Sequence, residues 1–552
     1  MHNMDHGLKI DLLIKERGVY MKQIKKYLAF IAAIIFMISL ADVGNLNCKA
    51  AVSRDYFLSG NLYYHKVSGG QAEVCGTKKV KGKLTIPKTV TYKGRNYKVT
   101  GIADLECTHG EESVYGLCAG TEVFSYHEYH YEEKFPKGIH TIAGSGITEV
   151  VLPKTLAYIG EGAFDGCHQL KKVRFAKKYK KLVIGKNAFT NTAVKELIFP
   201  EGTSEIRECA TGEAEDITIP ASVKKIGSGV VNARTKNIKV SKKNKNFKVK
   251  SGILYTYNEK TLLGVSAKAG KKVQISSKTT KIEKEAFAYN EKIRQVHLGS
   301  KVNEIPKAAF AGCNHLTKIE GTDNIKKIGY VAFAECKKLT DIGTLSNLQE
   351  IENGAFWGNI NLVVPIPISS KMKIADYAFC GNCYGAGVRV TVQENDPVYS
   401  IVSGLLIKKE GTEQRVILQN TDTNTIEVPE GVTDIIVSLR TSGVNGTITF
   451  PNSLRSHSAR LTIDDGFIIY KGKNAPEFCK EFLISNPLQY QNNNEIANDG
   501  MTTIIVPQGS LAEYKAKLEE AAHNFDQNHV DRWLDNGESL FGTETGLSII
   551  EK

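Results

Sequence analysis

The amino-acid sequence predicts a repeat solenoid, in which similar short units stack along one axis. Between residues 281 and 381, five consecutive segments contain an Ala-Phe pair, and their phenylalanines follow one another at intervals of 23 residues: Phe287, Phe310, Phe333, Phe356 and Phe379. A fixed period in the twenties is typical of stacked repeats. A single unit cannot bury its own apolar face, so neighbouring units must cover it from both sides.

Each unit also contains a strand pattern. In the first clear unit, Ile147, Val150 and Leu152 stand at positions i, i+3 and i+5, and Pro153 follows them. The alternation at the end of this set is typical of a strand with one buried face. The Ile before each Ala-Phe pair and the pair itself indicate a short turn or helix. We therefore expect each phenylalanine to stack on that of the next unit.

A small residue follows each repeat phenylalanine by three positions. It is a cysteine at Cys167, Cys313 and Cys336, and an asparagine at Asn290 and Asn359. Both residue types can satisfy turn backbone groups or fill a small buried slot. These cysteines are therefore predicted to be structural and unpaired.

Two further cysteines, Cys107 and Cys118, lie outside the repeats. They are the candidate disulfide pair, because disulfides form in exported proteins.

The first 50 residues do not belong to the solenoid. Residues 21–50 are typical of a secretory signal peptide, with lysines after Met21, an apolar run to Leu40 and a cleavage site after Ala50. The run is shorter than the roughly 20 residues of a membrane span, so we expect export and no transmembrane segment after cleavage. Residues 1–20 fit no part of such a signal and are interpreted as a mis-annotated leader.

Three regions follow the signal peptide. Residues 51–146 are predicted to form an N-terminal β cap with a Tyr/His/Glu-rich insertion. Residues 147–475 form the solenoid, with hairpin interruptions near 248–272 and 398–420, and residues 476–552 form a C-terminal strand and helix cap with a tail. The insertion has two histidines three residues apart, whereas zinc needs three or four ligands. We therefore expect a polar surface insertion, no metal and no cofactor.

The repeat pattern Leu-x-x-Val-x-Leu-Pro, followed by Ile-Gly-x-x-Ala-Phe-x-x-Cys, resembles the BspA-like class of bacterial leucine-rich-repeat surface proteins. The resemblance is specific across residues 147–382 and weak after Gly411. It implies a right-handed leucine-rich-repeat solenoid of the β/α type, with short parallel strands on its concave face. It also implies an exported protein with an adhesive or host-interaction role, and no catalytic residues.

The charge distribution points to an acidic partner. The chain has a net charge of +13, and residues 168–272 contain 24 Lys/Arg against eight Asp/Glu. Side chains between the buried strand positions face outward, and stacking aligns them in columns. The candidate ligand-facing residues are Lys171, Lys172, Arg174, Lys195, Arg294, His297 and Lys318. They favour an extracellular protein, an anionic glycan or a cell-wall polymer as partner. The alternative is that these lysines only solvate the surface.

Three classes of function remain open. The preferred one is a secreted or cell-surface adhesin or receptor. A structural, assembly or spacer role is an alternative, because the basic repeats and the acidic C-terminal cap can pair between molecules. An enzyme is disfavoured, because the sequence has no G-x-S-x-G, H-E-x-x-H or P-loop motif. Nucleic acid is disfavoured because aromatic residues do not alternate with the basic ones. The sequence does not indicate an oligomeric state.

Overall fold

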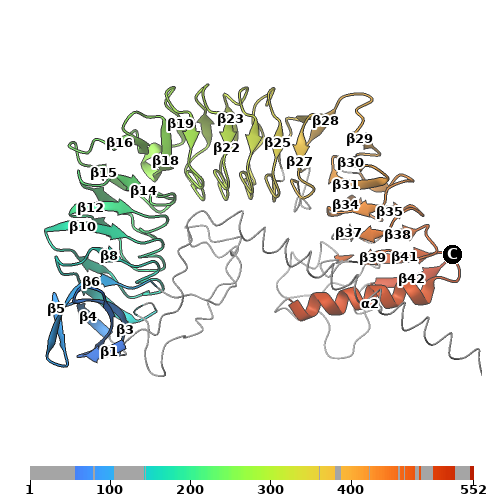
Figure 1. The fold of residues 1–552 in the computed structure, drawn as a ribbon. Helices are drawn as coiled ribbons and strands as arrows, with labels where there is room; N and C mark the ends of the chain where they lie inside the picture. Colours follow the sequence, from blue (N-terminus) through green and yellow to red (C-terminus); the bar gives the residue numbers. More distant parts are fainter. Residues whose placement is uncertain are drawn as a thin grey trace, which may run out of the picture. The chain divides into compact units, whose positions relative to one another are not determined.

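Most repeats form one coil with two short strands. The first strand lies where the sequence predicts it. A second strand begins just before the Ala-Phe pair, where the sequence suggested only a turn or helix. A corner joins the first strand to the second, and a turn that contains the Ala-Phe pair leads into the next coil. Strands of successive coils lie side by side (Figure 1), so the predicted repeat solenoid is confirmed.

The computed structural model describes residues 56–78, 81–104, 142, 144–359, 361–379, 387–421, 423–457, 461–464, 466–478, 484–485, 502–528 and 547–552. The expected leader, the signal peptide, most of the Tyr/His/Glu-rich insertion and the Cys107–Cys118 pair lie outside these residues. All described residues belong to one structural unit.

The first strands form what we call the first ladder, and each coil is named here by its first-ladder strand. This ladder consists of five separate parallel sheets. Their strands are β4 (Lys81–Thr85), β7 (Gly146–Val151) and β9 (Lys172–Arg174); β11 (Glu196–Ile198), β13 (Asp216–Ile219) and β15 (Asn237–Val240); β19 (Lys272–Gln274), β21 (Gln295–His297) and β23 (Lys318–Glu320); β26 (Ile366–Ile368) and β28 (Val390–Val392); and β32 (Thr425–Glu427), β35 (Thr447–Phe450), β38 (Phe467–Tyr470), β41 (Thr502–Val506) and β42 (Leu547–Glu551).

The second strands form the second ladder, which is also parallel from coil to coil. Its strands are β6 (Arg95–Ile102), β8 (Tyr158–Ile159), β10 (Lys178–Ile184), β12 (Glu201–Ile206) and β14 (Lys225–Ile226); β20 (Lys281–Ile282); β22 (Glu304–Ile305), β24 (Lys327–Ile328), β25 (Glu350–Ile351) and β27 (Lys373–Ile374); and β33 (Asp434–Ile435), β36 (Ser456–His457) and β39 (Glu477–Phe478).

Three antiparallel meanders each lead into a part of the second ladder. In each meander, the third strand pairs in parallel with the next ladder strand. Their strands are β1 (Tyr56–Ser59), β2 (Leu62–Val67) and β3 (Gln71–Thr77); β16 (Phe247–Lys250), β17 (Ile253–Thr256) and β18 (Thr261–Val265); and β29 (Tyr399–Val402), β30 (Leu405–Glu410) and β31 (Glu413–Gln419).

A few elements lie beside the two ladders. The remaining strands are β5 (Thr89–Tyr92), β34 (Leu439–Val444), β37 (Leu461–Asp464) and β40 (Ile484–Ser485). A 3-10 turn, η1 (Ala267–Ala269), follows the second meander. Among the described residues, α2 (Leu511–Asn528) is the only α-helix, and its Tyr514 and Leu518 pack into the last apolar core.

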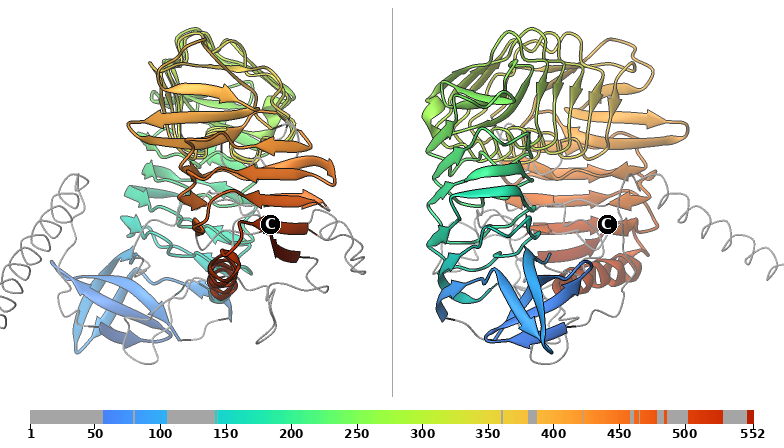
Figure 2. Two further views of the ribbon diagram at one scale, coloured as in Figure 1. Left: turned by 90° about the vertical axis from the view of Figure 1, so that its right-hand side faces the viewer. Right: turned by 60° about the vertical axis from the view of Figure 1, so that its left-hand side comes forward.

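The repeat phenylalanines form one continuous column, as predicted. Ring centroids are 4.5 Å apart between Phe287 and Phe310, and the next three steps along the column measure 5.3, 5.7 and 5.8 Å. All five rings are at most 1% exposed. Figure 2 shows the coils of this array from the side. Each ring is buried by its neighbours above and below, so the column depends on adjacent coils having the same shape.

The residue three positions after each phenylalanine holds one coil on another. The thiols of Cys313 and Cys336 donate to the carbonyls of Phe287 and Phe310 in the preceding coil, both at 3.1 Å. The Asn359 amide makes the same bond to Phe333 at 2.8 Å. The predicted structural role of the repeat cysteines is confirmed, since Cys167, Cys313 and Cys336 are free and buried. Cys209, which the sequence pattern did not single out, is disulfide-bonded.

Among the described residues, the apolar interior is divided into three large cores. One runs from Phe57 to Leu263, the next from Ile253 to Leu418 and the last from Leu405 to Leu547. The second and third meanders separate them and contribute to the core on each side. In β17, Leu254 belongs to the first core, whereas Ile253 belongs to the second. These two meanders are therefore internal walls with both faces buried.

Burial on both faces explains the composition of the wall strands. Ile253, Leu254 and Tyr255 are all buried, because alternate residues of a strand point into different cores. In the N-terminal meander, β2 alternates between buried Leu62 and Tyr64 and partly exposed neighbours. A strand with one wet face alternates, whereas a strand covered on both faces is continuously apolar.

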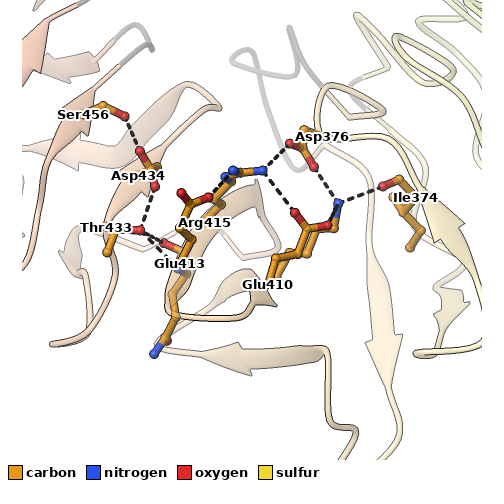
Figure 3. Close-up of polar contacts among 10 residues, drawn as sticks. Ile374, Asp376, Glu410, Glu413, Arg415, Thr433, Asp434 and Ser456 are labelled. Atoms are coloured by element: carbon orange, nitrogen blue, oxygen red, sulfur yellow. Dashed lines mark hydrogen bonds and ion pairs between the residues drawn. The ribbon is translucent and has the colours of Figure 1, made fainter. Parts of the chain in front are cut away.

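An ion-pair network connects the third meander, which is the second of the two internal walls, to the coil before it. The second ladder stops at β27 and resumes with the third meander, and no strand pair between them occurs among the described residues. Asp376 bridges this break, accepting from Lys408 at 2.7 Å and from Arg415 at 2.9 Å (Figure 3). Glu410 contacts the same two cations, and Glu413 also contacts Arg415. Ionic contacts thus replace the backbone ladder at this junction.

We predict that replacing Phe333 by Ala lowers the free energy of unfolding by about 3–5 kcal/mol, because it empties a slot between two stacked rings. Denaturant titration followed by circular dichroism measures the change. Lys338→Ala, at an exposed position of the next coil, is the control. An unshifted transition for Phe333→Ala would refute the structural role of the column.

We predict that Asp376→Ala selectively weakens the junction between β27 and the third meander, because Lys408, only 12% exposed, loses a charged partner. The free energy that protects amides of β30 and β31 from hydrogen exchange should fall by about 1.5–3 kcal/mol, with β21 and β23 unchanged. Glu477→Ala, which removes a side chain that is 80% exposed and paired with Lys517, should have little effect. Equal effects of both variants would contradict the proposed bridge.

Candidate ligand-binding surface

The seven candidate ligand-facing residues all lie along the first ladder. Lys172 and Arg174 lie on β9, His297 on β21 and Lys318 on β23, and the other three directly precede a strand. They belong to three of the ladder's separate sheets, and among them only β21 and β23 pair with each other. The structure therefore arranges them in short groups instead of one long column.

Acidic residues of neighbouring coils occupy several of these cations. Arg174 donates to Glu149 at 2.7 Å, and this bond holds the pKa of the Glu149 carboxyl below its usual range. Glu149 also contacts Lys83 of the preceding strand at 3.4 Å. Lys195 contacts Glu215 at 3.1 Å.

The same holds farther along the ladder. Lys318 contacts Glu320 at 3.0 Å and Asp341 at 3.5 Å, and Glu320 also contacts His297 at 3.5 Å. Arg294 donates to backbone carbonyls of its own coil, the shortest bond being 2.8 Å to Glu291. Of the seven, only Lys171 and Lys172 are exposed and have no ion pair with a described residue. Most of the expected basic column is thus engaged within the protein.

A second group of lysines lies at the corner of the coil, which we define as the segment after each first-ladder strand together with the first residues of the strand that follows. Ten lysines there are exposed, and none forms an ion pair with a described residue. We call this group the lysine track; it consists of Lys177, Lys178, Lys180 and Lys181 in the β9 coil, Lys224 and Lys225 in the β13 coil, Lys242, Lys243 and Lys245 in the β15 coil, and Lys278 in the β19 coil.

A buried tyrosine fixes the first lysines of the track. Tyr179, 2% exposed, lies between the pair Lys177-Lys178 and the pair Lys180-Lys181. Its hydroxyl donates to the carbonyl of Leu152 in the preceding coil at 3.3 Å and accepts from the Ala176 N–H at 3.0 Å. Because this ring is anchored inward, the lysines on either side of it stay at the surface.

A buried asparagine has the same role in the β15 coil. The Asn244 amide donates to the carbonyls of Pro220 at 2.8 Å and Val223 at 3.1 Å, both in the preceding coil. Its side-chain oxygen accepts from the N–H groups of Asn246 and Phe247. The flanking lysines of the track are thus held on a corner pinned to the coil below.

The remaining lysines also flank buried anchors. Lys224 and Lys225 follow Val223, which is fully buried. Lys278 precedes Thr279, whose hydroxyl donates to the carbonyl of Glu259 at 2.9 Å. In every coil of the track, an inward-facing residue therefore separates or borders outward-facing lysines.

One buried carboxylate lies beside the track and holds two further lysines. Glu259 contacts Lys248 at 2.7 Å and Lys250 at 3.4 Å, and accepts from the Ser276 hydroxyl at 2.5 Å. The Lys248 and Ser276 bonds outweigh the effect of burial and lower the pKa of Glu259 from its usual 4.5 to about 2. Lys248 and Lys250 are therefore paired within the second meander and are not counted in the lysine track.

Sequence reasoning missed the lysine track because it assigned outward positions from the first strand alone. The available signal was the recurrence of Lys-Lys pairs just after that strand, next to a single residue that can be buried. Because the second strand was not predicted, the sequence did not show which residues of the corner point inward and which point outward.

The described residues do not assemble the parts of another kind of site. Within them, no three His, Cys, Asp or Glu side chains converge as metal ligands would. No helix in this part of the chain has the length and hydropathy of a membrane span. The insertion histidines, including His127 and His130, lie outside the described ranges.

Comparison with protein families places the coils described above. Residues 138–256 and 267–385 match the model of the BspA type leucine-rich repeat region, in six copies. The coils within these two ranges are BspA-type leucine-rich repeats. The BspA-type match covers the whole phenylalanine column and every lysine of the track. The family resemblance inferred from the repeat residues is thus confirmed.

Solved structures of other bacterial proteins resemble the chain. A leucine-rich cell surface protein from Faecalibacterium prausnitzii A2-165 shares 20% identity over 62% of this chain and 97% of its own, with a TM-score of 0.39. The pneumococcal vaccine antigen PcpA shares 18% over 84% and 96%, with a TM-score of 0.31. A leucine-rich repeat protein from Bacteroides ovatus ATCC 8483 shares 15% over 87% and 100%, with a TM-score of 0.28. No curated protein matches the chain.

We predict that Glu259 makes stability depend on pH. Its pKa is lower in the folded protein than in the unfolded chain, so its stabilising contribution is present above about pH 4.5 and declines as the pH falls toward 2. Unfolding free energies at pH 5 and pH 3 should therefore differ less in Glu259→Gln than in the wild type. If both proteins show the same difference, Glu259 does not contribute to acid sensitivity.

Proposed function

We propose that this protein is a secreted or cell-surface binding protein, and that its lysine track holds an anionic partner. The observation that carries the proposal is that ten exposed lysines have no ion pair with a described residue, although Arg174, Lys195 and Lys236 along the nearby first ladder are paired. Such a concentration of unpaired charge attracts acidic molecules and speeds their association.

The repeat family and the expected signal peptide support the same function. BspA-type leucine-rich repeats belong to a family that typically binds other molecules and does not catalyse reactions. Residues 21–50 have the sequence features of a secretory signal, so the proposed partner is an extracellular protein, an anionic glycan or a cell-wall polymer. The free repeat cysteines do not conflict with an oxidising location, because they are buried and burial raises the pKa of the Cys313 thiol to about 12.

We predict that reversing three track charges, with Lys177→Glu, Lys178→Glu and Lys180→Glu together, weakens binding to anionic polymers about 100-fold. Each lysine near an anionic surface contributes on the order of 1 kcal/mol, and reversal removes at least that much. Biolayer interferometry on immobilised sulfated, carboxylated, phosphorylated and neutral polymers measures the loss.

Two comparison variants make this test specific. Lys292→Glu, Lys338→Glu and Lys371→Glu change the net charge equally at exposed positions outside the track and should bind normally. The triple reversal of Lys171, Lys172 and Arg174 tests the first ladder itself. Equal losses in all three variants would mean that net charge, and not the track, governs binding. No binding by the wild type to any anionic polymer would refute the proposed function.

A further inference from the structure

We infer that the partner is a linear polyanion that lies along the solenoid axis and contacts several coils at once. This inference rests on the proposed function and adds the shape and orientation of the partner. It follows from how the ten lysines are distributed among the coils, which can be traced through the strand register.

The lysines of the track lie on successive coils and not at one point. Strand β10 pairs with β12, and β12 with β14, so the coils that contain Lys178 and Lys225 are separated by one coil. The β15 coil extends the track further, because β13 pairs with β15, and the β19 coil follows after the second meander. Coils stack at the strand spacing of about 4.8 Å, so the three paired steps from the β9 coil to the β15 coil alone cover about 14 Å. A compact anion can reach only part of this length.

The acidic side chains of the β11 coil, which lies between the β9 and β13 coils, already have partners within the protein. Glu201 lies opposite Lys178 in the strand register, and its carboxylate accepts from the Ala221 N–H at 3.0 Å. Glu205 contacts Arg207 of its own coil at 3.2 Å. A polyanion that crosses the β11 coil at the corner therefore meets two carboxylates that already have partners. Glu201 is bonded to the backbone of the next coil, and Glu205 is neutralised by Arg207.

The first ladder offers a less favourable path. Between the β9 and β15 coils, its outer side carries Glu196, Glu215 and Asp216, and Lys195 is already paired with Glu215. A polyanion following that side would pass acidic side chains on two consecutive coils. The corner is thus the path along the axis with the greater excess of positive charge.

Such a track implies that affinity depends on ligand length. A short chain engages the lysines of one coil, whereas a longer chain engages several coils, and each added contact becomes intramolecular. Affinity should therefore rise with length until the ligand covers the track, and then level off. The number of counterions released should rise in parallel, so longer ligands should show a steeper dependence of affinity on salt.

The test is a titration of the full chain with heparin-derived oligosaccharides of graded length, followed by isothermal calorimetry at several salt concentrations. Polyphosphates of matched length distinguish a sulfated glycan from a phosphate polymer as the source of the charge. Inositol hexakisphosphate provides a compact anion of high charge. We expect Kd to fall at least 100-fold from the shortest to the longest chains and then to level off near the length of the track.

Variants near the two ends of the track, in the β9 coil and in the β15 coil, make the test specific. Lys178→Glu with Lys180→Glu, and Lys242→Glu with Lys243→Glu, should each remove most of the advantage of long chains. Either variant should affect the shortest chains much less, because these can still bind at the intact end. The triple variant at Lys292, Lys338 and Lys371 is the charge-matched control, and thermal unfolding by circular dichroism checks that each variant is folded.

The outcomes separate the two proposals. Binding that is independent of length, or a compact anion that binds as tightly as the longest polymer, overturns the linear partner but leaves the lysine track as a binding site. Absence of binding at every length overturns both. Loss of affinity in the control variant as large as in the end variants also overturns the linear partner, because binding would then follow net charge.

Discussion

The structure depends on each coil lying directly on the next with the same cross-section. Two contacts enforce this arrangement in the regular repeats. The phenylalanine rings stack on one another, and a thiol or amide three residues later donates to the carbonyl of the phenylalanine in the preceding coil. Stacking aligns the rings without fixing their depth, whereas the hydrogen bond fixes the distance between coils. Together they explain why Phe, Ala and Cys or Asn recur at constant spacing while the exposed positions vary.

The same three-stranded meander covers the N-terminal end of the solenoid and also forms the two walls inside it. At the N-terminal end, the module covers the first core on one side only, and β2 alternates between buried and partly exposed residues. Inside the solenoid, the same topology is covered on both sides, and β17 and β30 have three consecutive buried residues. Each internal meander interrupts the second ladder, so side-chain contacts take over part of the coupling between neighbouring cores. The network around Asp376 is the clearest example, because its ion pairs cross a break that no strand pair of the described part of the chain bridges.

The distribution of charge follows from the same stacking. In-register strands place the side chains of neighbouring coils close together, so a carboxylate on one coil can hold bases on either side of it, as Glu149 and Glu215 do. Stacking thus tends to neutralise charge along the ladders. At the corners, the chain turns outward around a buried anchor such as Tyr179 or Asn244, and the adjacent lysines form no ion pair with a described residue, because the acids opposite them in register, Glu201 and Glu205, are bonded elsewhere. A binding surface for anions therefore lies where the ladder pairing ends.

The sequence by itself determined the solenoid, its period, the phenylalanine column and the role of the repeat cysteines, because these features depend on contacts that recur at a fixed interval along the chain. Only the tertiary structure decided the second ladder, the division into three cores and which lysines remain unpaired. A two-residue strand such as Lys327–Ile328 has too little local pattern to be recognised without its neighbours. The pairing of Arg174 with Glu149, 25 residues away, depends on the register between coils, which a list of exposed positions does not contain.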